Sequence, residues 1–238
     1  MEKRSIVWIF LCLSLGVLIF ITNSCKKNET PPDPTPNPPP SYGTVSDIDG
    51  NVYLTLIIGS QEWMVQNLRT SRLNDGTAIP FVVNETAWGN LTTPGYCWYY
   101  ANSDYKYPYG GLYNWATVNT GKLAPTGWRV PTEADWLKLI NYLGGTDIAG
   151  GKMKEQGTSH WLAPNSDATN SSWFSDIPGG IRGFEGGFFL FGSNSFLWSS
   201  TESSFSEGWS VGCSYCLSLV STGDLAKGDG CSVRCVKN

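Results

Sequence analysis

A proline-rich segment divides this chain into a short N-terminal part and a long C-terminal part. Seven of the ten residues from 31 to 40 are proline. Proline fixes φ and lacks a backbone N–H, so neither a helix nor a central strand continues through such a run. The segment favours polyproline II, which rises about 3.1 Å per residue, and we interpret residues 25–41 as a stiff linker. We therefore expect one folded domain after it, at residues 42–238.

The residues before the linker are similar to a bacterial lipoprotein signal. Lys3 and Arg4 precede an apolar run from residue 6 to 21, and a short polar stretch leads to Cys25. In such signals the charged start stays in the cytoplasm, the apolar run enters the translocon, and a peptidase cleaves before the cysteine. We expect residues 1–24 to be a signal peptide and Cys25 to carry a lipid.

Lipidation at Cys25 would tether the domain to a membrane of the cell envelope. The outer membrane is the expected destination, and the sequence leaves open which leaflet the domain faces. The alternative is an uncleaved transmembrane anchor, although sixteen largely apolar residues fall short of the roughly 20 that span a bilayer.

Charged residues are scarce in this chain. They make up 15% of it, and the net charge is −4. Without a basic field to attract phosphates, we expect no nucleic-acid partner. A single histidine, His160, excludes sites built from several imidazoles, such as multi-histidine zinc and copper centres. We interpret His160 as a hydrogen-bonded loop residue.

Glycine and aromatic residues predict a loop-rich fold with a core of large rings. The chain has 27 glycines, 11 tryptophans and 11 tyrosines, which suit tight turns and aromatic packing. Two strands are expected at residues 52–68 around Gly59-Ser60, after a tight turn at residues 47–51. Further short strands are expected at residues 188–191, 196–200, 216–220 and 232–236.

The clearest helix signal lies at residues 132–143. Thr132 and Asp135 have the spacing of a capping box, and two glycines follow the helix. Apolar residues at spacings of three and four predict one buried stripe, formed by Trp136, Leu137, Ile140 and Leu143. A weaker helix signal spans residues 112–118. Together, these strand and helix signals predict an α+β fold with few helices.

Nine short motifs occur in one order along the domain. They include Gly127-Trp-Arg-Val-Pro-Thr-Glu-Ala-Asp-Trp and Pro178-Gly-Gly-Ile-Arg, and the others begin at Asp47, Trp63, Tyr96, Gly111, Ala149, Trp198 and Ser232. Together they resemble the Fibrobacter succinogenes major paralogous domain, a family frequent in lipoproteins of Bacteroidetes and Fibrobacteres. The resemblance covers roughly residues 44–238.

The resemblance implies a C-type-lectin-like fold, in which a twisted antiparallel sheet and two short helices support long loops. The segment from Trp128 to Trp136 is also similar to one in formylglycine-generating enzymes, which supports the fold more than the activity. Relatives often carry a cysteine where this chain has Leu123, so a disulfide from that position is excluded. The calcium-binding motifs of lectins are missing, and we expect no metal and no cofactor.

Four cysteines near the end have spacing close to that of a zinc site: Cys213, Cys216, Cys231 and Cys235. Because an exported domain meets oxidising machinery, we favour disulfides. Antiparallel strands around Asp224 would place Cys216 opposite Cys231 and Cys213 opposite Cys235, although the sequence does not fix the connectivity. Cys97 then remains unpaired, and we expect it to be buried and inert.

Residues 96–115 contain seven tyrosines and two tryptophans. Flat apolar rings flanked by amides and acids are typical of surfaces that bind sugars. The predicted ligand-binding residues are Tyr105, Tyr107, Tyr109, Asn102, Asp104 and, in a different segment, Glu202. The alternative is that these rings serve packing, since Trp98, Tyr113 and Trp115 belong to the shared motifs.

The sequence favours a non-catalytic recognition module for a glycan or protein ligand at the envelope. Nucleophilic catalysis needs an activating base, and His160 has no identifiable partner in the sequence. One alternative is an envelope hydrolase that uses a carboxylate pair chosen from Asp176, Glu185, Glu202 and Glu207. Another is a structural component of the envelope with neighbouring proteins as partners.

Overall fold

The computed structural model describes residues 40–238. The predicted signal peptide, Cys25 and nearly all of the linker lie outside the described residues. No helix found between residues 40 and 238 has the length and apolar character needed to cross a membrane.

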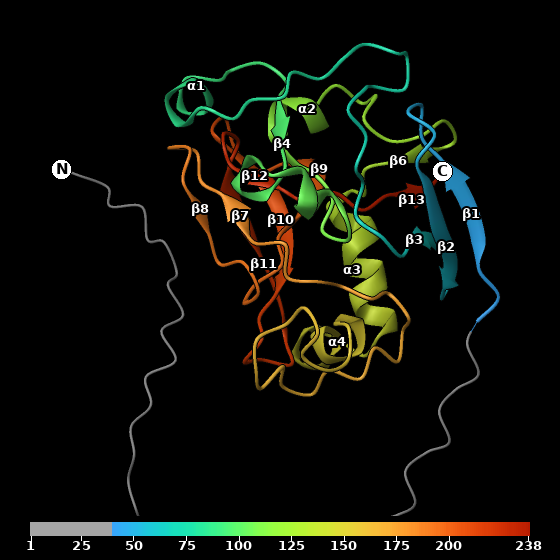
Figure 1. Cartoon of the computed structure of the whole chain (residues 1–238). Helices are drawn as coiled ribbons and strands as arrows, with labels where there is room; N and C mark the ends of the chain where they lie inside the picture. Colours follow the sequence, from blue (N-terminus) through green and yellow to red (C-terminus); the bar gives the residue numbers. More distant parts are fainter. Residues whose placement is uncertain (1–39) are drawn as a thin grey trace, which may run out of the picture. The chain divides into compact units, whose positions relative to one another are not determined.

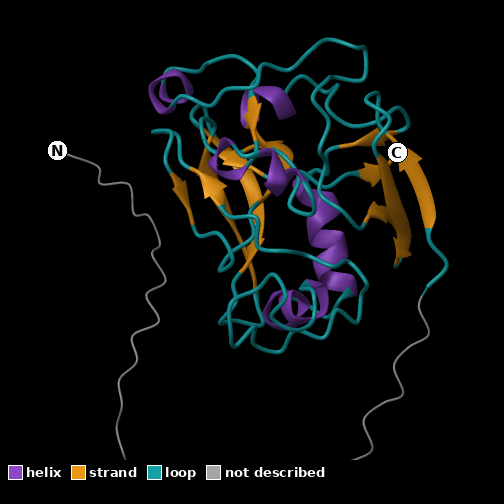
Figure 2. Cartoon of the chain, in the orientation of Figure 1, coloured by secondary structure: helices purple, strands orange, loops and turns teal. Residues whose placement is uncertain are grey.

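Three antiparallel sheets form most of the regular structure (Figures 1 and 2). The first sheet has the order β1-β2-β3-β13-β6, the second β11-β10-β9 and the third β4-β5-β12-β7-β8. The strands are β1 (Gly43–Ser46), β2 (Val52–Ile58), β3 (Gln61–Met64), β4 (Tyr96–Cys97), β5 (Leu112–Asn114), β6 (Trp128–Arg129), β7 (Ile181–Arg182), β8 (Phe188–Phe189), β9 (Leu197–Glu202), β10 (Glu207–Cys213), β11 (Val220–Ala226), β12 (Gly230–Cys231) and β13 (Val236–Lys237).

The helices are short and few. They are α1 (Glu85–Gly89), α2 (Trp115–Val118), α3 (Glu133–Tyr142) and α4 (Thr146–Met153), with two 3-10 segments, η1 (Tyr99–Ala101) and η2 (Ser103–Lys106). The described residues therefore form a β-rich fold. Helices are few, as the α+β prediction expected, although the expected number of two is corrected to four. Residues 112–118, predicted as a helix, divide into strand β5 and helix α2.

The β2–β3 hairpin forms where the sequence predicts it. Strands β2 and β3 pair in antiparallel register with Ile58 opposite Gln61, and Gly59 adopts a φ of +64° in the turn. The tight turn before it is also confirmed, because Asp47 Oδ1 accepts hydrogen bonds from the backbone N–H groups of Asp49 and Asn51 at 3.0 and 2.9 Å.

Helix α3 begins with the predicted capping box. Thr132 Oγ1 accepts from Asp135 N at 3.2 Å, and Asp135 Oδ2 accepts from Thr132 N at 2.9 Å. The buried stripe differs by one residue from the prediction, since Leu137 is 40% exposed and Leu139 is buried instead. Each residue turns a helix by about 100°, so Leu139 shares a face with Trp136 and Ile140, whereas Leu137 does not.

Helix α3 packs between the first and second sheets. Its Trp136, Leu139 and Ile140 belong to one buried cluster that also contains Trp63 of β3 and Leu197 of β9. Figure 1 shows α3 between β2 and β3 on one side and β9 and β10 on the other. A second cluster, built around Tyr53, Tyr113 and Trp198, fills the space beside it. The rings counted in the sequence therefore form the core.

Three fully buried cations bind the carbonyl oxygens of loops. Arg182 donates to the carbonyl oxygens of Gly186, Val82 and Val83, at 3.0, 2.5 and 3.0 Å. Lys154 Nζ donates to three carbonyls, at 2.8 to 3.0 Å, which belong to Ser166, Ser214 and Leu217. These bonds hold segments that lie outside the strands.

The third buried cation is Arg234. It donates to Asn67 Oδ1 at 2.9 Å and to the carbonyl oxygens of Phe174 and Ser175, and its guanidinium lies over the Phe174 ring. Burial lowers the pKa of Arg234 to about 10, which leaves the side chain charged at neutral pH. Nearby, the fully buried Asp176 accepts from Ser195 Oγ at 2.5 Å, and burial raises the pKa of this carboxyl.

The C-terminal strands differ from the sequence prediction. Residues 216–220 form a turn that ends at the start of β11, and of residues 232–236 only Val236 lies in a strand. Asp224 lies inside β11, opposite Trp209, and is not at a turn. The chain then leaves the second sheet, and Cys231 pairs with Tyr113 of β5 in the third.

This path separates the cysteines that were expected to pair. Cys213 lies opposite Val220 and Cys231 opposite Tyr113, so neither predicted pair forms, and no disulfide joins any two cysteines of residues 40–238. Cys97 is buried, as predicted, and burial raises the pKa of its thiol to about 11. Across the described part of the chain, no group of three or more His, Cys, Asp or Glu side chains is arranged to hold a metal ion.

We predict that Arg182→Met lowers the free energy of unfolding by about 3 kcal/mol or more, because it leaves three loop carbonyls without their donor. Urea denaturation measures this loss. Arg72→Met is the matched control, because Arg72 is exposed and forms only a surface ion pair with Asp49 at 3.5 Å. It should cost less than about 1 kcal/mol. Equal losses in the two variants would contradict a structural role for the buried guanidinium.

Candidate functional site

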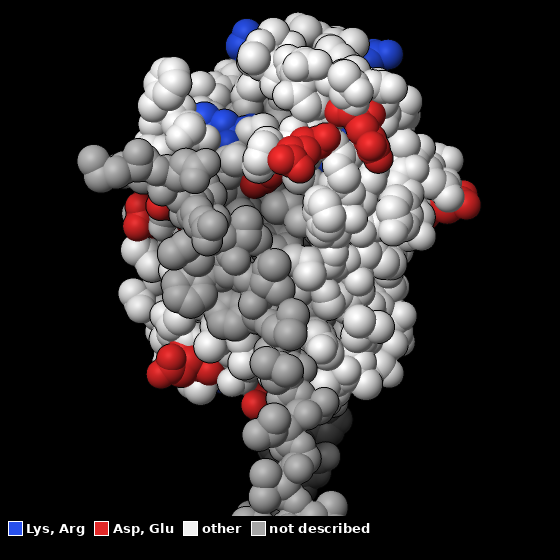
Figure 3. Space-filling view, turned by 90° about the vertical axis from the view of Figure 1, so that its left-hand side faces the viewer, with Lys and Arg blue, Asp and Glu red and all other residues white. Residues whose placement is uncertain are grey.

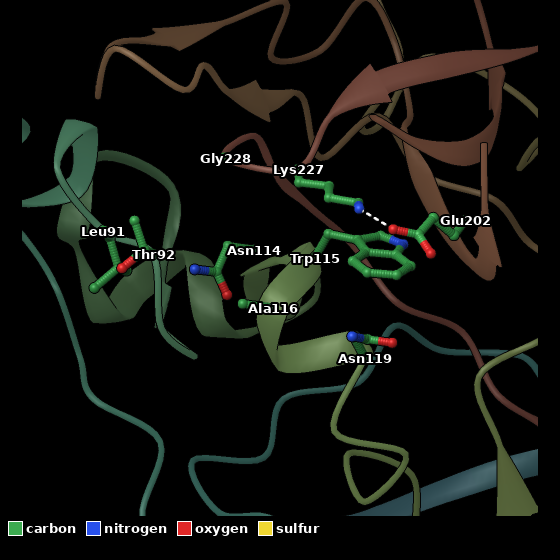
Figure 4. A pocket seen from close by; sticks show the side chains of 9 residues that line it. All are labelled: Leu91, Thr92, Asn114, Trp115, Ala116, Asn119, Glu202, Lys227 and Gly228. Carbon is green, nitrogen blue, oxygen red and sulfur yellow. Dashed lines mark hydrogen bonds and ion pairs between the residues drawn. The ribbon is translucent and has the colours of Figure 1, made fainter. Parts of the chain in front are cut away.

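A pocket of about 370 Å³ opens beside Trp115 (Figure 4). We call it the Trp115 pocket. It is lined by Leu91, Thr92, Asn114, Trp115, Ala116, Asn119, Glu202, Lys227 and Gly228. These residues come from the loop before β4, from β5 and α2, from the end of β9 and from the segment after β11, so four separate parts of the chain meet here.

Asn114 positions the floor of the Trp115 pocket. It ends β5 and caps α2, with its Oδ1 accepting from Thr117 N and Gly95 N, both at 3.1 Å. Its Nδ2 donates to Thr93 O at 2.8 Å. Since both polar atoms of the Asn114 amide are bonded within the protein, the side chain fixes Trp115 at the first position of α2.

The segment 227–229 forms one wall and is held from several sides. Lys227 N donates to Ser206 O at 2.9 Å, and Lys227 O accepts from Trp115 N at 3.0 Å. The indole of Trp88 donates to Gly228 O at 2.9 Å. Asp229 Oδ1 accepts from Phe184 N at 2.7 Å, and burial raises the pKa of this carboxyl to about 6. The wall is therefore rigidly placed.

An ion pair crosses the pocket. Lys227 Nζ donates to Glu202 Oε1 and to Phe205 O, and it lies 4.6 Å from the centre of the Trp115 ring. Figure 4 shows the ammonium and carboxylate groups meeting above the indole. The Glu202 side chain is 56% exposed and that of Lys227 is 23% exposed. The pocket therefore carries one charge of each sign, already paired.

Several polar groups of the pocket have no partner within residues 40–238. The exposed side chains of Asn119 and Thr92 make no hydrogen bond there, and Glu202 Oε2 accepts none. The buried Trp115 Nε1 also has no acceptor, and in Figure 4 it is turned toward Glu202. The pocket thus offers both donors and acceptors to a ligand.

The predicted tyrosine residues lie in a separate loop, which we call the tyrosine loop (residues 99–109). Tyr105 and Tyr109 are half-buried, and both pack on Phe191 with ring centroids 5.1 and 4.7 Å away. Ring planes in this cluster meet at angles from 36° to 87°. The rings therefore interlock and do not form one flat surface.

The other predicted residues of the tyrosine loop are exposed. Tyr107 is 59% exposed, and Arg69 lies over its ring at 4.7 Å. Asn102 Oδ1 accepts from Asp104 N at 2.9 Å and so begins η2. Glu202 is not part of this loop, because it lines the Trp115 pocket and no residue of 99–109 does. The structure thus divides the six predicted ligand-binding residues between two places.

His160 has a partner that the sequence did not indicate. Its Nδ1 lies 2.7 Å from Glu155 Oε2, and its ring packs edge-on against Tyr109. This agrees with the interpretation of His160 as a hydrogen-bonded loop residue.

A second pocket, of about 400 Å³, lies between the β2–β3 hairpin, the start of α3 and the C-terminus. Its charges are paired, with Arg129 Nη2 2.7 Å from Asp135 Oδ1 and Lys237 Nζ 2.7 Å from Glu62 Oε2. Because Asp135 also caps α3, these groups stabilise the local structure.

The four acids considered for a hydrolase occupy different environments. Asp176 is fully buried, and Glu185 is exposed in the turn between β7 and β8. Glu202 pairs with Gly208 across β9 and β10. Since neighbouring residues of a strand point to opposite faces, Glu207 points away from the face that carries Glu202.

We predict that Gly208→Ala distorts the Trp115 pocket. A Cβ at Gly208 would lie 2.4 Å from Cδ1 and 2.5 Å from Nε1 of Trp115, which is buried and cannot move freely. The expected loss is about 1 to 3 kcal/mol of unfolding free energy, with a change in tryptophan fluorescence. Gly223→Ala, in the neighbouring strand, is the control because its Cβ would meet nothing within 4 Å. Unchanged stability in G208A would refute the close contact.

Comparison with known proteins identifies a family. A family model, the Fibrobacter succinogenes major domain, matches residues 56–237. Neither a curated protein nor a solved structure matches the chain significantly. The matched range contains all residues of the Trp115 pocket and of the tyrosine loop, and it exceeds half of the chain. The chain therefore belongs to the Fibrobacter succinogenes major domain family.

Proposed function

We propose that this protein is a non-catalytic, membrane-tethered recognition module of the cell envelope, with a glycan or protein as its ligand. The observation that carries the proposal is the Trp115 pocket, which is open to solvent, held by hydrogen bonds on its walls and supplied with unpartnered polar groups. Such a combination of a preformed concave site and a few polar groups is typical of ligand-binding sites.

The surface supports binding to a partner of low charge. Figure 3 shows a face on which Lys, Arg, Asp and Glu side chains are scattered among uncharged ones. Within residues 40–238, six ion pairs are formed, among them those of Arg129 with Asp135 and of Lys227 with Glu202. Neither observation favours a polyanion such as nucleic acid as the partner.

We also propose that the fold is C-type-lectin-like. Its antiparallel sheets, its few short helices and the long loops between them support this proposal. In such an architecture the sheets provide a rigid base, and ligand-binding residues lie on loops. Function still follows from the site and not from the fold.

The binding proposal is tested with the full-length protein purified in detergent. It is screened on a glycan array and, immobilised, against detergent-solubilised envelope proteins of the source cells. We expect at least one ligand that binds saturably. Asn119→Ala, which alters an exposed pocket residue, should weaken binding, while Asn90→Ala, on the surface at the end of α1, should not. If both screens are empty, the proposal is wrong.

The proposed lipid tether is tested by replacing the acylated cysteine. Cys25→Ser should move the protein from the membrane fraction to the soluble fraction, because stable anchoring depends on the acyl chains. Cys12→Ser, within the apolar run, is the matched control and should leave the protein in the membrane fraction. If Cys25→Ser also stays membrane-bound, the transmembrane-anchor alternative is supported, and mass spectrometry of the mature N-terminus decides between them.

A further inference from the structure

We propose that the Trp115 pocket binds an uncharged sugar unit of a glycan, with Phe205 as a stacking residue at its rim. This inference rests on the proposed recognition function and names the class of ligand and the residues that contact it. Four observations support it: the neutralised charge, the mixture of donors and acceptors, the exposure of Phe205 and the size of the pocket.

The paired charges of the pocket favour a neutral ligand. Lys227 Nζ donates to Glu202 Oε1, and both groups contact the same small space. A carboxylate or phosphate on the ligand would be repelled by Glu202, and an ammonium group would be repelled by Lys227. A charged ligand must therefore compete with an ion pair that is already formed, whereas a neutral ligand leaves it intact.

The unpartnered groups match sugar hydroxyls. A hydroxyl group donates one hydrogen bond and accepts others, so it needs both kinds of partner close together. Asn119 has an amide that donates and accepts, Glu202 Oε2 accepts, and Thr92 does both. The third proton of Lys227 Nζ has no acceptor within the described residues. Neighbouring hydroxyls of one sugar ring present the same alternation of donors and acceptors.

Phe205 supplies an apolar face beside these polar groups. It lies at the tip of the β9–β10 hairpin, and its side chain is 98% exposed. Its carbonyl oxygen accepts from Lys227 Nζ at 2.9 Å, which places its backbone beside the pocket, and we assign its ring to the rim. Aromatic rings combine a large apolar area with defined geometry, and the C–H face of a sugar is a suitable partner.

The hairpin that carries Phe205 is fixed in place. Ser203 N and Ser204 N both donate to Glu207 O at 3.1 Å, and Ser203 Oγ donates to Asp224 Oδ1 at 2.5 Å. An exposed phenylalanine on a well-anchored turn has few internal contacts that explain it. Its place beside Lys227 is the reason for assigning it to contact with a ligand.

The size of the pocket suits a small part of a larger ligand. Its volume of about 370 Å³ lies at the lower end of the range for ligand pockets, roughly 300 to 1,000 Å³. The tyrosine loop is a less suitable site for the same unit, since Tyr105 and Tyr109 are packed against Phe191 with their ring planes at 86° and 59° to it. A terminal or exposed sugar of a glycan chain fits these limits.

The test uses the full-length protein in detergent and an array of neutral oligosaccharides, with uronic-acid-containing oligosaccharides of similar length as the anionic set. We expect binding to at least one neutral glycan. Phe205→Ser and Asn119→Ala should each weaken its Kd about tenfold. Both residues are exposed, so the variants should fold, which circular dichroism and thermal melting verify.

The matched controls are exposed residues outside the pocket. Phe189→Ser changes an exposed phenylalanine in β8, and Glu207→Gln changes an acid on the opposite face of the same hairpin. Both should leave the Kd within about twofold of the unaltered protein. Higher salt should also leave binding to the neutral glycan nearly unchanged, because the ligand carries no charge that the salt would screen.

Each other outcome overturns a distinct claim. If only anionic glycans bind, the ligand class is wrong and the recognition function stands. If a neutral glycan binds but Phe205→Ser and Asn119→Ala have no effect, the site is wrong. If neither a glycan nor an envelope protein binds, the proposed function itself fails together with this inference.

Discussion

The buried cations of Arg182, Lys154 and Arg234 are the interaction on which the rest of this structure depends. Long stretches of the chain lie outside the sheets, and their carbonyl groups cannot be satisfied by strand pairing. Each cation instead binds two or three carbonyl oxygens, two of which belong to residues 59 to 100 positions away in the sequence. A planar guanidinium suits this task because its donors point in several fixed directions.

The three buried cations lie in the shared sequence motifs, and for this reason the motifs predict the fold better than they predict the ligand. Lys154 belongs to the motif that begins at Ala149, Arg182 ends the motif that begins at Pro178, and Arg234 lies in the motif that begins at Ser232. All three are fully buried. Of the residues proposed to contact a ligand, Asn119 and Phe205 lie outside the quoted motifs, so a family resemblance alone does not identify them.

Local signals in the sequence predicted the elements that depend on local interactions. The β2–β3 hairpin needs only its turn and its two strands, and α3 needs its capping box and its apolar stripe. Helix α4 was missed because it lacks such signals. Its Gly150 and Gly151 weaken helix propensity, yet a Cβ at either position would lie 2.5 Å from a backbone oxygen of another loop. Only the tertiary structure explains that requirement.

The C-terminal strands and the candidate site depended on long-range contacts. The sequence could not show that β12 joins β5 and β7 while β11 joins β10, and this path separates the cysteines that were expected to pair. Glu202 was predicted from the motif that begins at Trp198 alone. Its partner Lys227 lies 25 residues further on, and the pocket forms only when β9, α2 and the segment after β11 meet. No local sequence pattern predicts that these three segments come together.

The proposed lipid tether changes the affinity that such a pocket needs. A neutral sugar unit in a small pocket makes few hydrogen bonds, each with a net contribution of only about 0.5 to 1.5 kcal/mol, because the hydroxyls leave equally good partners in water. Many tethered copies on one membrane facing a repetitive glycan would gain about 10²- to 10⁴-fold in apparent affinity without any new contact. A rigid pocket wall adds to this gain, since residues 227–229 do not have to become ordered when the ligand binds. Weak single-site binding and strong binding to a glycan-bearing surface are therefore compatible properties of the same protein.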